Sequence, residues 1–144
     1  MFKQLTVFLE NKTGRIEEVT GCLANEKINL HALSIADTAD FGILRMVVSD
    51  PDKAVTVLKE KNFMVKTADV IAVPMGHSPG SLHEVLTKLK KLDISIKYMY
   101  AFTSRHKDYD SIVILRLHDQ EKALEKISGI SILGQELLAC LNES

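Results

Sequence analysis

The stretch LTVFLENKTG, residues 5–14 of this 144-residue chain, recurs 66 positions later as IAVPMGHSPG, residues 71–80. In both copies apolar residues alternate as in a half-buried strand, and a turn-rich loop then ends at a glycine. Apolar side chains at helical spacing follow each glycine, and in the first copy these are Ile16, Val19 and Leu23. The recurrence predicts an internal duplication in which each copy begins with a strand, a glycine loop and a helix.

The rest of the first copy predicts two strands, a helix and a last strand. The strands are expected at Ile28–Ala36 and Gly42–Ser49. Asp50-Pro51-Asp52 then signals a helix start, because proline suits the first turn and carboxylates suit its positive end. A fourth strand is expected at Phe63–Val70. The order βαββαβ is that of the ferredoxin-like motif, an antiparallel sheet with both helices on one face.

The second copy follows the same order and differs at its end. Three extra residues fall in a polar loop, Thr103–Asp110, where insertions are tolerated. The end of the chain predicts a short strand at Ile130–Ile132 and a helical turn at Gln135–Leu141. The sequence therefore predicts an α+β protein of two ferredoxin-like βαββαβ units in tandem, residues 1–69 and 70–144.

The composition is typical of a soluble globular protein, with 46% hydrophobic and 26% charged residues. The formal net charge is -1, so no basic face for nucleic acid or for an anionic membrane is visible. No apolar run reaches the length of a membrane span, and the first residues alternate like a strand. We therefore expect a cytoplasmic protein with no nucleic-acid partner and no membrane partner.

Neither a metal nor a cofactor is indicated. Cys22 and Cys140 are far apart and flanked by apolar residues, as expected of buried thiols rather than a disulfide. The five histidines are scattered and show no metal-ligand spacing.

The two glycine loops are the candidate binding elements. They read Asn11-Lys12-Thr13-Gly14-Arg15-Ile16 and His77-Ser78-Pro79-Gly80-Ser81-Leu82. The start of a helix offers unpaired N–H groups and a positive dipole end, and glycine lets a ligand approach the backbone. Such a site suits a carboxylate, whereas phosphate-loop and dinucleotide spacings are missing. The alternative is structural: the glycines make the turns, and Asn11, Thr13 or Ser78 caps the helix.

These loops carry a resemblance to the ACT domain, a ligand-binding regulatory module of amino-acid metabolism. In the first copy the resemblance rests on the glycine loop and on Ile28-Asn29-Leu30 at the start of the second strand. In the second copy it rests on Ser78–Leu82 and on Ile94-Ser95-Ile96. The resemblance covers nearly the whole chain and is closest to stand-alone tandem ACT proteins. It implies that second strands join edge to edge into an eight-stranded sheet.

The resemblance also implies where ligands would sit, namely between one unit's glycine loop and the other unit's second strand. Asn11 and Asn29 match the polar ligand-contacting positions, and His77 and Ser95 are their second-copy equivalents. If the copies pair within one chain, the first loop would combine with Ser95-Ile96 and the second loop with Asn29-Leu30. The implied site residues are Asn11, Lys12, Thr13, Gly14, Arg15, Ile16, Asn29, Leu30, His77, Ser78, Pro79, Gly80, Ser81, Leu82, Ser95 and Ile96.

The two implied sites differ from the family pattern and from each other. Thr13 stands where proline is usual, and His77 stands where asparagine is common. We therefore expect the sites to differ in affinity or preference. A directly contacting His77 would make binding pH-dependent, although an exposed loop histidine is an equally open interpretation.

Strand alternation predicts an apolar outer sheet face, opposite the helices. If Leu44 and Met46 face the helices, their neighbours face outward, and the second copy repeats the pattern. The expected outer face comprises Leu33, Ile35, Ile43, Arg45, Val47, Met99, Ile112, Ile114 and Arg116. Such a patch predicts a homodimer through this face. The alternative is a patch interrupted by charged side chains, namely Arg45, Arg116, His31 and Lys97.

These observations favour a regulatory sensor of an amino acid or related metabolite over an enzyme. A regulatory subunit of an amino-acid biosynthetic enzyme is the first alternative, and a small ferredoxin-like enzyme is the second. Candidate acid–base groups are His83 with Glu84, His106 with Asp108 and Asp110, and His118 with Asp119. Adjacent residues on a helix do not face each other, residues 103–110 are expected to be a solvated loop, and no nucleophile lies in a triad context. A purely structural role also stays open.

Overall fold

The computed structural model describes residues 1–103 and 110–143 of the chain. The chain divides into two compact units, Lys3–Asp69 and Val70–Ser144, and the second also includes Met1–Phe2. The predicted polar loop lies largely outside the described residues, as do His106 and Asp108. Among the described residues, no helix is long and apolar enough to cross a membrane. No group of potential metal ligands gathers in this part of the chain either.

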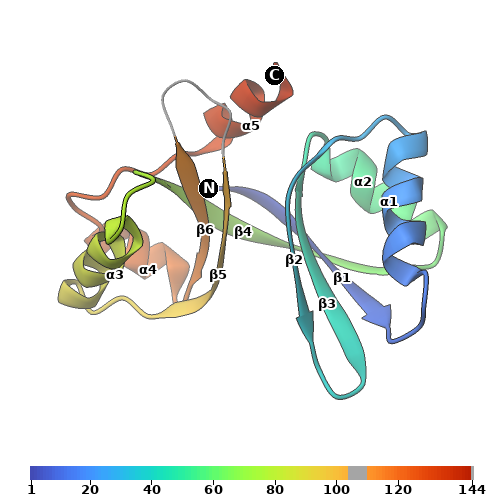
Figure 1. The fold of residues 1–144 in the computed structure, drawn as a ribbon, viewed down its shortest axis with the longest axis horizontal. Helices are drawn as coiled ribbons and strands as arrows, with labels where there is room; N and C mark the ends of the chain where they lie inside the picture. Colours follow the sequence, from blue (N-terminus) through green and yellow to red (C-terminus); the bar gives the residue numbers. More distant parts are fainter. Residues whose placement is uncertain (104–109, 144) are drawn as a thin grey trace. The chain divides into compact units, whose positions relative to one another are not determined.

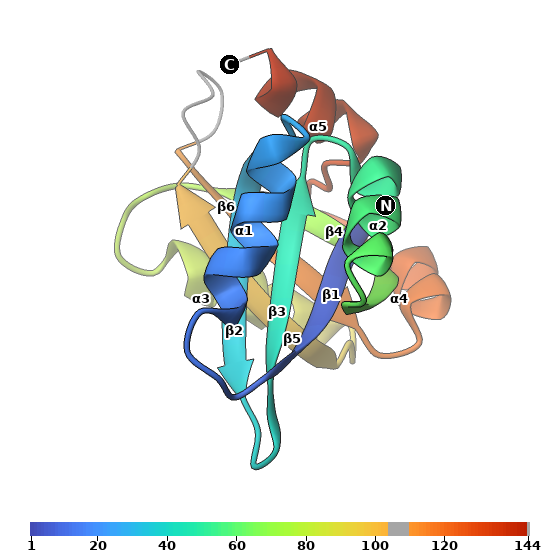
Figure 2. The ribbon, with the colours of Figure 1, turned by 90° about the vertical axis from the view of Figure 1, so that its right-hand side faces the viewer.

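The first unit has the predicted order of strands and helices. It contains β1 (Phe2–Glu10), α1 (Arg15–Asn25), β2 (Leu30–Asp37), β3 (Phe41–Val48), α2 (Pro51–Glu60) and the start of β4 (Met64–Met75). Strand β3 pairs antiparallel with both β1 and β2. Figures 1 and 2 show α1 and α2 on the same face of this sheet. Helix α2 begins as predicted, because the Asp50 carboxylate accepts a hydrogen bond from the Lys53 backbone N–H at 3.0 Å.

The second unit repeats this plan with a changed end. It contains the rest of β4, α3 (Ser81–Lys91), β5 (Ile96–Thr103), β6 (Ser111–Leu117), α4 (Gln120–Lys126) and α5 (Gln135–Asn142). Strand β6 pairs antiparallel with β4 and β5. The predicted strand at Ile130–Ile132 is wrong, because only one isolated bridge, Ala72 to Leu133, forms there. The predicted final helical turn is a helix of 8 residues.

The core of each unit lies between its sheet and its helices. In the first unit the sheet residues Leu5, Val7, Leu44 and Met46 are buried together with α1 and α2. In the second unit Ile71, Val73, Val113 and Leu115 are buried together with Val85 and Leu89 of α3. Equivalent positions of the duplicated sequence therefore form equivalent cores, as the alternation of strand residues predicts.

Strand β4 belongs to both units. It is a single strand of 12 residues, the last strand of the first unit and the first strand of the second. The hydrogen-bonded order of the described strands is therefore β2-β3-β1-β4-β6-β5, a sheet of six. The second strands, β2 and β5, stand at opposite ends of this order, so the predicted edge-to-edge pairing is not part of it. The sequence analysis predicted one strand at the end of the first copy and another at the start of the second, whereas residues 64–75 form a single continuous strand.

Both second strands contain a bulge at the same point of the repeat. The register shifts between Leu30 and Ala32 in β2, and between Ile96 and Tyr98 in β5. Such a shift inserts one residue and moves all later side chains to the opposite face. The inserted residues are His31 and Lys97, which are 66 positions apart.

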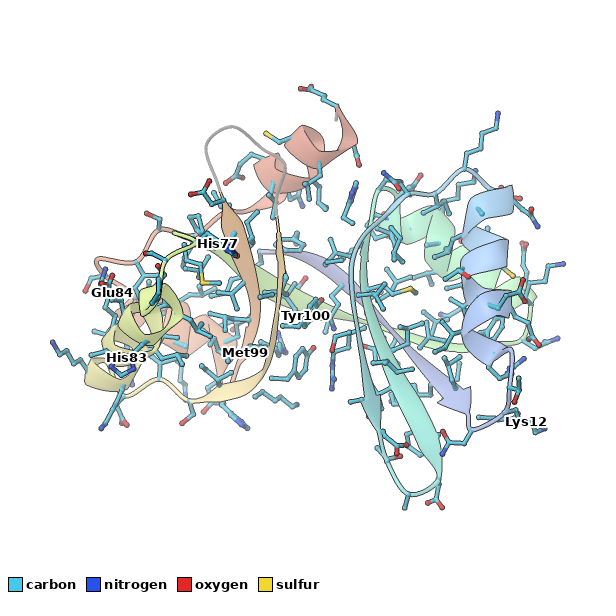
Figure 3. The ribbon with its side chains drawn as sticks, viewed as in Figure 1. Lys12, His77, His83, Glu84, Met99 and Tyr100 are labelled. Carbon is cyan, nitrogen blue, oxygen red and sulfur yellow. The ribbon has the colours of Figure 1, made fainter. Side chains whose placement is uncertain are left out.

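The bulges correct the prediction for three apolar residues. Leu33 and Ile35 lie opposite Met46 and Leu44 of β3, on the face that carries the helices. Met99 likewise lies opposite the core residue Leu115. Figure 3 shows Met99 and Tyr100 on opposite sides of β5. The predicted outer-face location of Leu33, Ile35 and Met99 is therefore wrong.

The rest of the predicted outer face is not an exposed apolar patch. Val47, Ile112 and Ile114 are each 0% exposed. Ile43, Arg45 and Arg116 are half-buried. The prediction assumed an open sheet face, whereas these side chains are already buried within one chain. Exposed apolar side chains instead include Ile16, Leu33 and Ile35 in the first unit and Met99 in the second.

Candidate functional site

Both glycine loops adopt a conformation that requires glycine. Gly14 and Gly80 have φ values of 88° and 93°, in the left-handed region, immediately before α1 and α3. Neither helix has a side-chain cap, so the predicted alternative of capping by Asn11, Thr13 or Ser78 is wrong. A Cβ built on either glycine would meet no atom within 4 Å. The backbone at both helix starts is therefore approachable.

A hollow lies beside the glycine loop of the second unit. Its volume is about 570 Å³, and it is lined by Met75–His83, Leu86 and Ser111. Apolar side chains of β4 and α3 form part of its wall, and the loop contributes His77 and hydroxyl groups. The Ser78 and Ser81 hydroxyl oxygens are 3.0 Å apart and hydrogen-bonded to each other. Figure 3 shows His77 on this loop. The hollow thus combines apolar walls with a polar rim, as small-molecule sites commonly do.

A smaller hollow occupies the same position in the first unit. Its volume is about 320 Å³, and it is lined by Leu9–Thr13, Arg15, Ile16, Ile35 and Gly42. Lys12, labelled in Figure 3, forms an ion pair with Glu10 at 2.7 Å. The hydrogen bond from Lys12, followed by its charge, lowers the pKa of the Glu10 carboxyl. The charges of this loop are thus partly satisfied within the loop.

Arg15 has local partners in the first unit. Its guanidinium forms an ion pair with Glu18, one turn later on α1. It also lies 4.6 Å from the centroid of the Phe63 ring, in a cation–π contact. These two contacts hold the Arg15 guanidinium between the first turn of α1 and the residue just before β4. The structure therefore supports a stabilising role for a residue that the sequence placed in the ligand site.

The second-strand residues of the implied site do not line either glycine-loop hollow. The Asn29 backbone N–H donates to the Ser49 hydroxyl at 2.9 Å, and the Ser49 backbone N–H donates back to the Asn29 carbonyl. Ser95 and Ile96 line a different hollow of about 300 Å³ between α3 and the start of β5. Each unit by itself therefore brings its loop residues together, while the contribution of Asn29, Leu30, Ser95 and Ile96 stays a prediction.

Of the candidate acid–base groups that the structure describes, His83 contacts a hydroxyl group rather than its predicted carboxylate partner. His83 has its ring Nε2 atom 3.5 Å from the Thr87 hydroxyl oxygen, one turn along α3, rather than beside Glu84. Figure 3 shows His83 and Glu84 at separate places around α3. His118 and Asp119 are both exposed between β6 and α4.

Sequence reasoning missed nine of the residues that line the two hollows. Six of them adjoin the glycine loops along the chain, namely Leu9, Glu10, Met75, Gly76, His83 and Leu86. Ile35, Gly42 and Ser111 come from the second and third strands of the repeat rather than from the glycine loops. The duplication contained the necessary signal for two of them, because a shift of 69 aligns Gly42 with Ser111. Their position beside the loop depends on strand register, which the sequence alone did not define.

Comparisons with known proteins agree on one family. The model of a family described as an ACT domain pair matches residues 1–136. The crystal structure of protein BT0572 from Bacteroides thetaiotaomicron is 43% identical, covers 94% of both chains and has a TM-score of 0.85. No curated protein is similar enough to count as a match.

More distant similarities concern the fold alone. The ligand-free regulatory subunit of aspartate kinase from Thermus thermophilus is 13% identical, with a TM-score of 0.60. It covers 86% of this chain and 88% of its own. The corresponding subunit from Thermus flavus is 15% identical, with the same two coverages and a TM-score of 0.57.

Proposed function

Because the chain belongs to the ACT domain pair family, we propose that it is a regulatory protein that senses an amino acid or a related metabolite, and not an enzyme. The observation that carries this proposal is the pair of equivalent hollows beside Gly14 and Gly80. Both hollows border a helix start that no side chain caps. A hollow beside the glycine loop in each copy of the repeat suits a protein that binds small molecules at two equivalent positions.

The chemistry of the hollows suits an α-amino acid. Its carboxylate would accept hydrogen bonds from backbone N–H groups at the helix start, where the helix dipole favours negative charge. Its side chain would contact the apolar wall, to which Met75, Leu82 and Leu86 contribute in the second unit. Asn11 or His77 would provide a further polar contact at the rim of its hollow, since both side chains can donate and accept hydrogen bonds.

The free edges of the second strands are the proposed interface for a second copy. Strands β2 and β5 end the hydrogen-bonded order of the described strands. Exposed apolar residues follow the β2 side of the first unit, with Leu33 at 49% and Ile35 at 50%, and Ile16 is exposed on α1. Edge-to-edge pairing would cover these side chains and satisfy the strand edge. It would also bring a second strand of one chain toward a glycine loop of the other, so that ligand sites would form between chains rather than within one chain as predicted.

A regulatory subunit acting through contact with an enzyme is the alternative. The exposed apolar residues Ile16, Leu33 and Ile35 would then contact the partner enzyme instead of a second copy. The two aspartate kinase regulatory subunits share the fold of this chain. Sedimentation of the purified chain distinguishes these possibilities, because a self-paired protein sediments as a dimer without any partner.

A thermal-shift screen against the twenty amino acids tests the proposal. A ligand that binds only the folded chain stabilises it by about 2.7 kcal/mol at a hundredfold excess over its dissociation constant. We expect a selective rise that is lost in Gly80→Val. Gly129→Val is the matched control, because Gly129 also has a positive φ, of 68°, and open space around its Cβ position. If no amino acid raises the midpoint, the proposal of an amino-acid sensor is wrong.

A further inference from the structure

Gln120 is a buried polar residue at the first position of α4, and it is 6% exposed. The Leu117 backbone N–H donates to its Oε1 atom at 3.2 Å, and its Nε2 atom donates to the Met1 Sδ atom at 3.1 Å. Buried amide groups are normally hydrogen-bonded, and a thioether sulfur is a weak acceptor. The Met1 sulfur is therefore one of the partners that satisfy the Gln120 amide inside the second unit.

Met1 and Phe2 belong to the second unit, although the chain continues from Lys3 into the first. Phe2 is 2% exposed, so its ring is buried where β1 begins. We call Met1 and Phe2 the clasp, because they tie the start of β1 to the second unit. Through the Met1 sulfur, the clasp reaches the first residue of α4.

Helix α4 has fewer stabilising features of its own than α2, its counterpart in the first unit. Helix α2 has 10 residues, and the Asp50 carboxylate caps its start. Helix α4 has 7 residues, and Asp119, at the position of Asp50, makes no side-chain cap. Short helices are marginal without capping or packing. The start of α4 therefore depends on the contacts of Gln120, which stands where α2 has Pro51.

The Met1 side chain is accessible to oxidants. Met1 is 46% exposed, whereas the core residue Met46 is 0% exposed. Hydrogen peroxide oxidises a thioether to a sulfoxide: the O–O bond breaks, one oxygen atom bonds to sulfur, and the peroxide is reduced to water. The product is polar and chiral, and its acceptor is the new oxygen atom rather than the sulfur. The hydrogen bond from Gln120 then loses its present geometry.

We propose that the clasp is a redox-sensitive switch, in which oxidation of the Met1 thioether by a peroxide releases Gln120 and loosens the start of α4. Reduction of the sulfoxide restores the contact, because this step of methionine oxidation is reversible. The inference concerns α4 and not the glycine-loop hollows, so it is independent of the proposed function.

The test uses a full-length chain in which Met1 is the methionine that peroxide reaches. Among the described residues, Met64 and Met99 are the other exposed methionines. Both are replaced by leucine, which keeps the apolar character of each position. Peptide mass spectrometry after brief treatment with hydrogen peroxide then identifies the sulfoxide at Met1.

Hydrogen exchange followed by NMR measures the response at two equivalent amides. The Ala123 backbone N–H donates to the Asp119 carbonyl at 2.9 Å in α4, and the Ala54 backbone N–H donates to the Asp50 carbonyl at 3.0 Å in α2. We expect oxidation to speed exchange of the Ala123 amide about tenfold and to change exchange of the Ala54 amide less than about twofold. Enzymatic reduction of the sulfoxide should return the Ala123 amide to its starting rate.

The variant Gln120→Leu removes the amide and keeps a side chain of similar size. In this variant, oxidation of Met1 should no longer change exchange of the Ala123 amide. Unchanged exchange at Ala123 after oxidation of Met1 in the chain that keeps Gln120 would overturn the inference. An equal increase at Ala54 would also overturn it, because the effect would then be general and not specific to α4. Resistance of Met1 to peroxide would show that its sulfur is not accessible, and the inference would fail.

Discussion

The guanidinium of Arg15 lies 4.6 Å from the centroid of the Phe63 ring, across the gap between the start of α1 and the start of β4. The same guanidinium pairs with Glu18. Arg15 therefore links α1 to Phe63, the residue that immediately precedes β4, at the edge of the first glycine loop. Its contacts are those of a stabilising residue.

Replacing Arg15 by alanine should lower the free energy of unfolding by about 1–2 kcal/mol, through loss of the cation–π contact and a partly exposed ion pair. Urea unfolding measures this change. Arg15→Met is the matched control, because methionine keeps much of the apolar stem over the ring and should cost less. A variant that keeps full stability but loses ligand affinity would instead make Arg15 a ligand residue.

Replacing Leu33 by glutamate should prevent formation of the proposed edge-to-edge dimer. Leu33 is 49% exposed at the free edge strand, so a charge there costs little in the isolated chain but is unfavourable in a covered interface. Size-exclusion chromatography with light scattering measures the mass. Met64→Glu is the control, because Met64 is 64% exposed and lies on β4, inside the strand order. A dimer that persists in Leu33→Glu would rule out the β2 edge as the interface.

The contribution of Glu136 to stability should depend on pH. Its carboxylate accepts a hydrogen bond from the Gly134 backbone N–H at 2.7 Å, and this bond holds the pKa of Glu136 below its ordinary value of 4.5. A lowered pKa in the folded state contributes stability above the unfolded-state pKa, and the contribution is lost as pH falls through the folded-state pKa. The difference in unfolding free energy between the unaltered chain and Glu136→Gln should therefore be present at about pH 7 and diminish as the pH falls below the ordinary value of 4.5.

Gln135→Ala, at the neighbouring exposed position of α5, is the control, because it removes no carboxyl group. Its difference from the unaltered chain should not change with pH over the same range. A difference for Glu136→Gln that is constant with pH would show that the hydrogen bond to Gly134 does not depend on the charge.

Local signals account for the parts of the fold that the sequence predicted. Asp50 and Pro51 mark the start of α2 through chemistry that acts within one turn. Gly14 and Gly80 were expected at the loops, and both occupy a left-handed conformation that other residues rarely adopt. The alternation through Leu5, Val7, Leu44 and Met46 identified the core face of β1 and β3. Each of these predictions needed only neighbouring residues.

The errors arose where one residue changes a long-range register. Nothing about the side chains of His31 and Lys97 marks them as bulge residues. Each bulge nevertheless moves the later side chains of its strand to the other face of the sheet. Leu33, Ile35 and Met99 were misplaced for this reason. Ser111 and Gly42 were missed because they reach the hollows only through the pairing of β6 with β4 and of β3 with β1.

Strand β4 runs from the core of the first unit to the hollow of the second unit without an intervening loop. Val65, near its first residue, lies in the core of the first unit, and Met75, its last residue, borders the second-unit hollow. Because one continuous strand supplies residues to both units, a one-residue shift in the register of β4 would turn side chains away from both cores at once. The two units therefore share a single requirement on the sequence of residues 64–75.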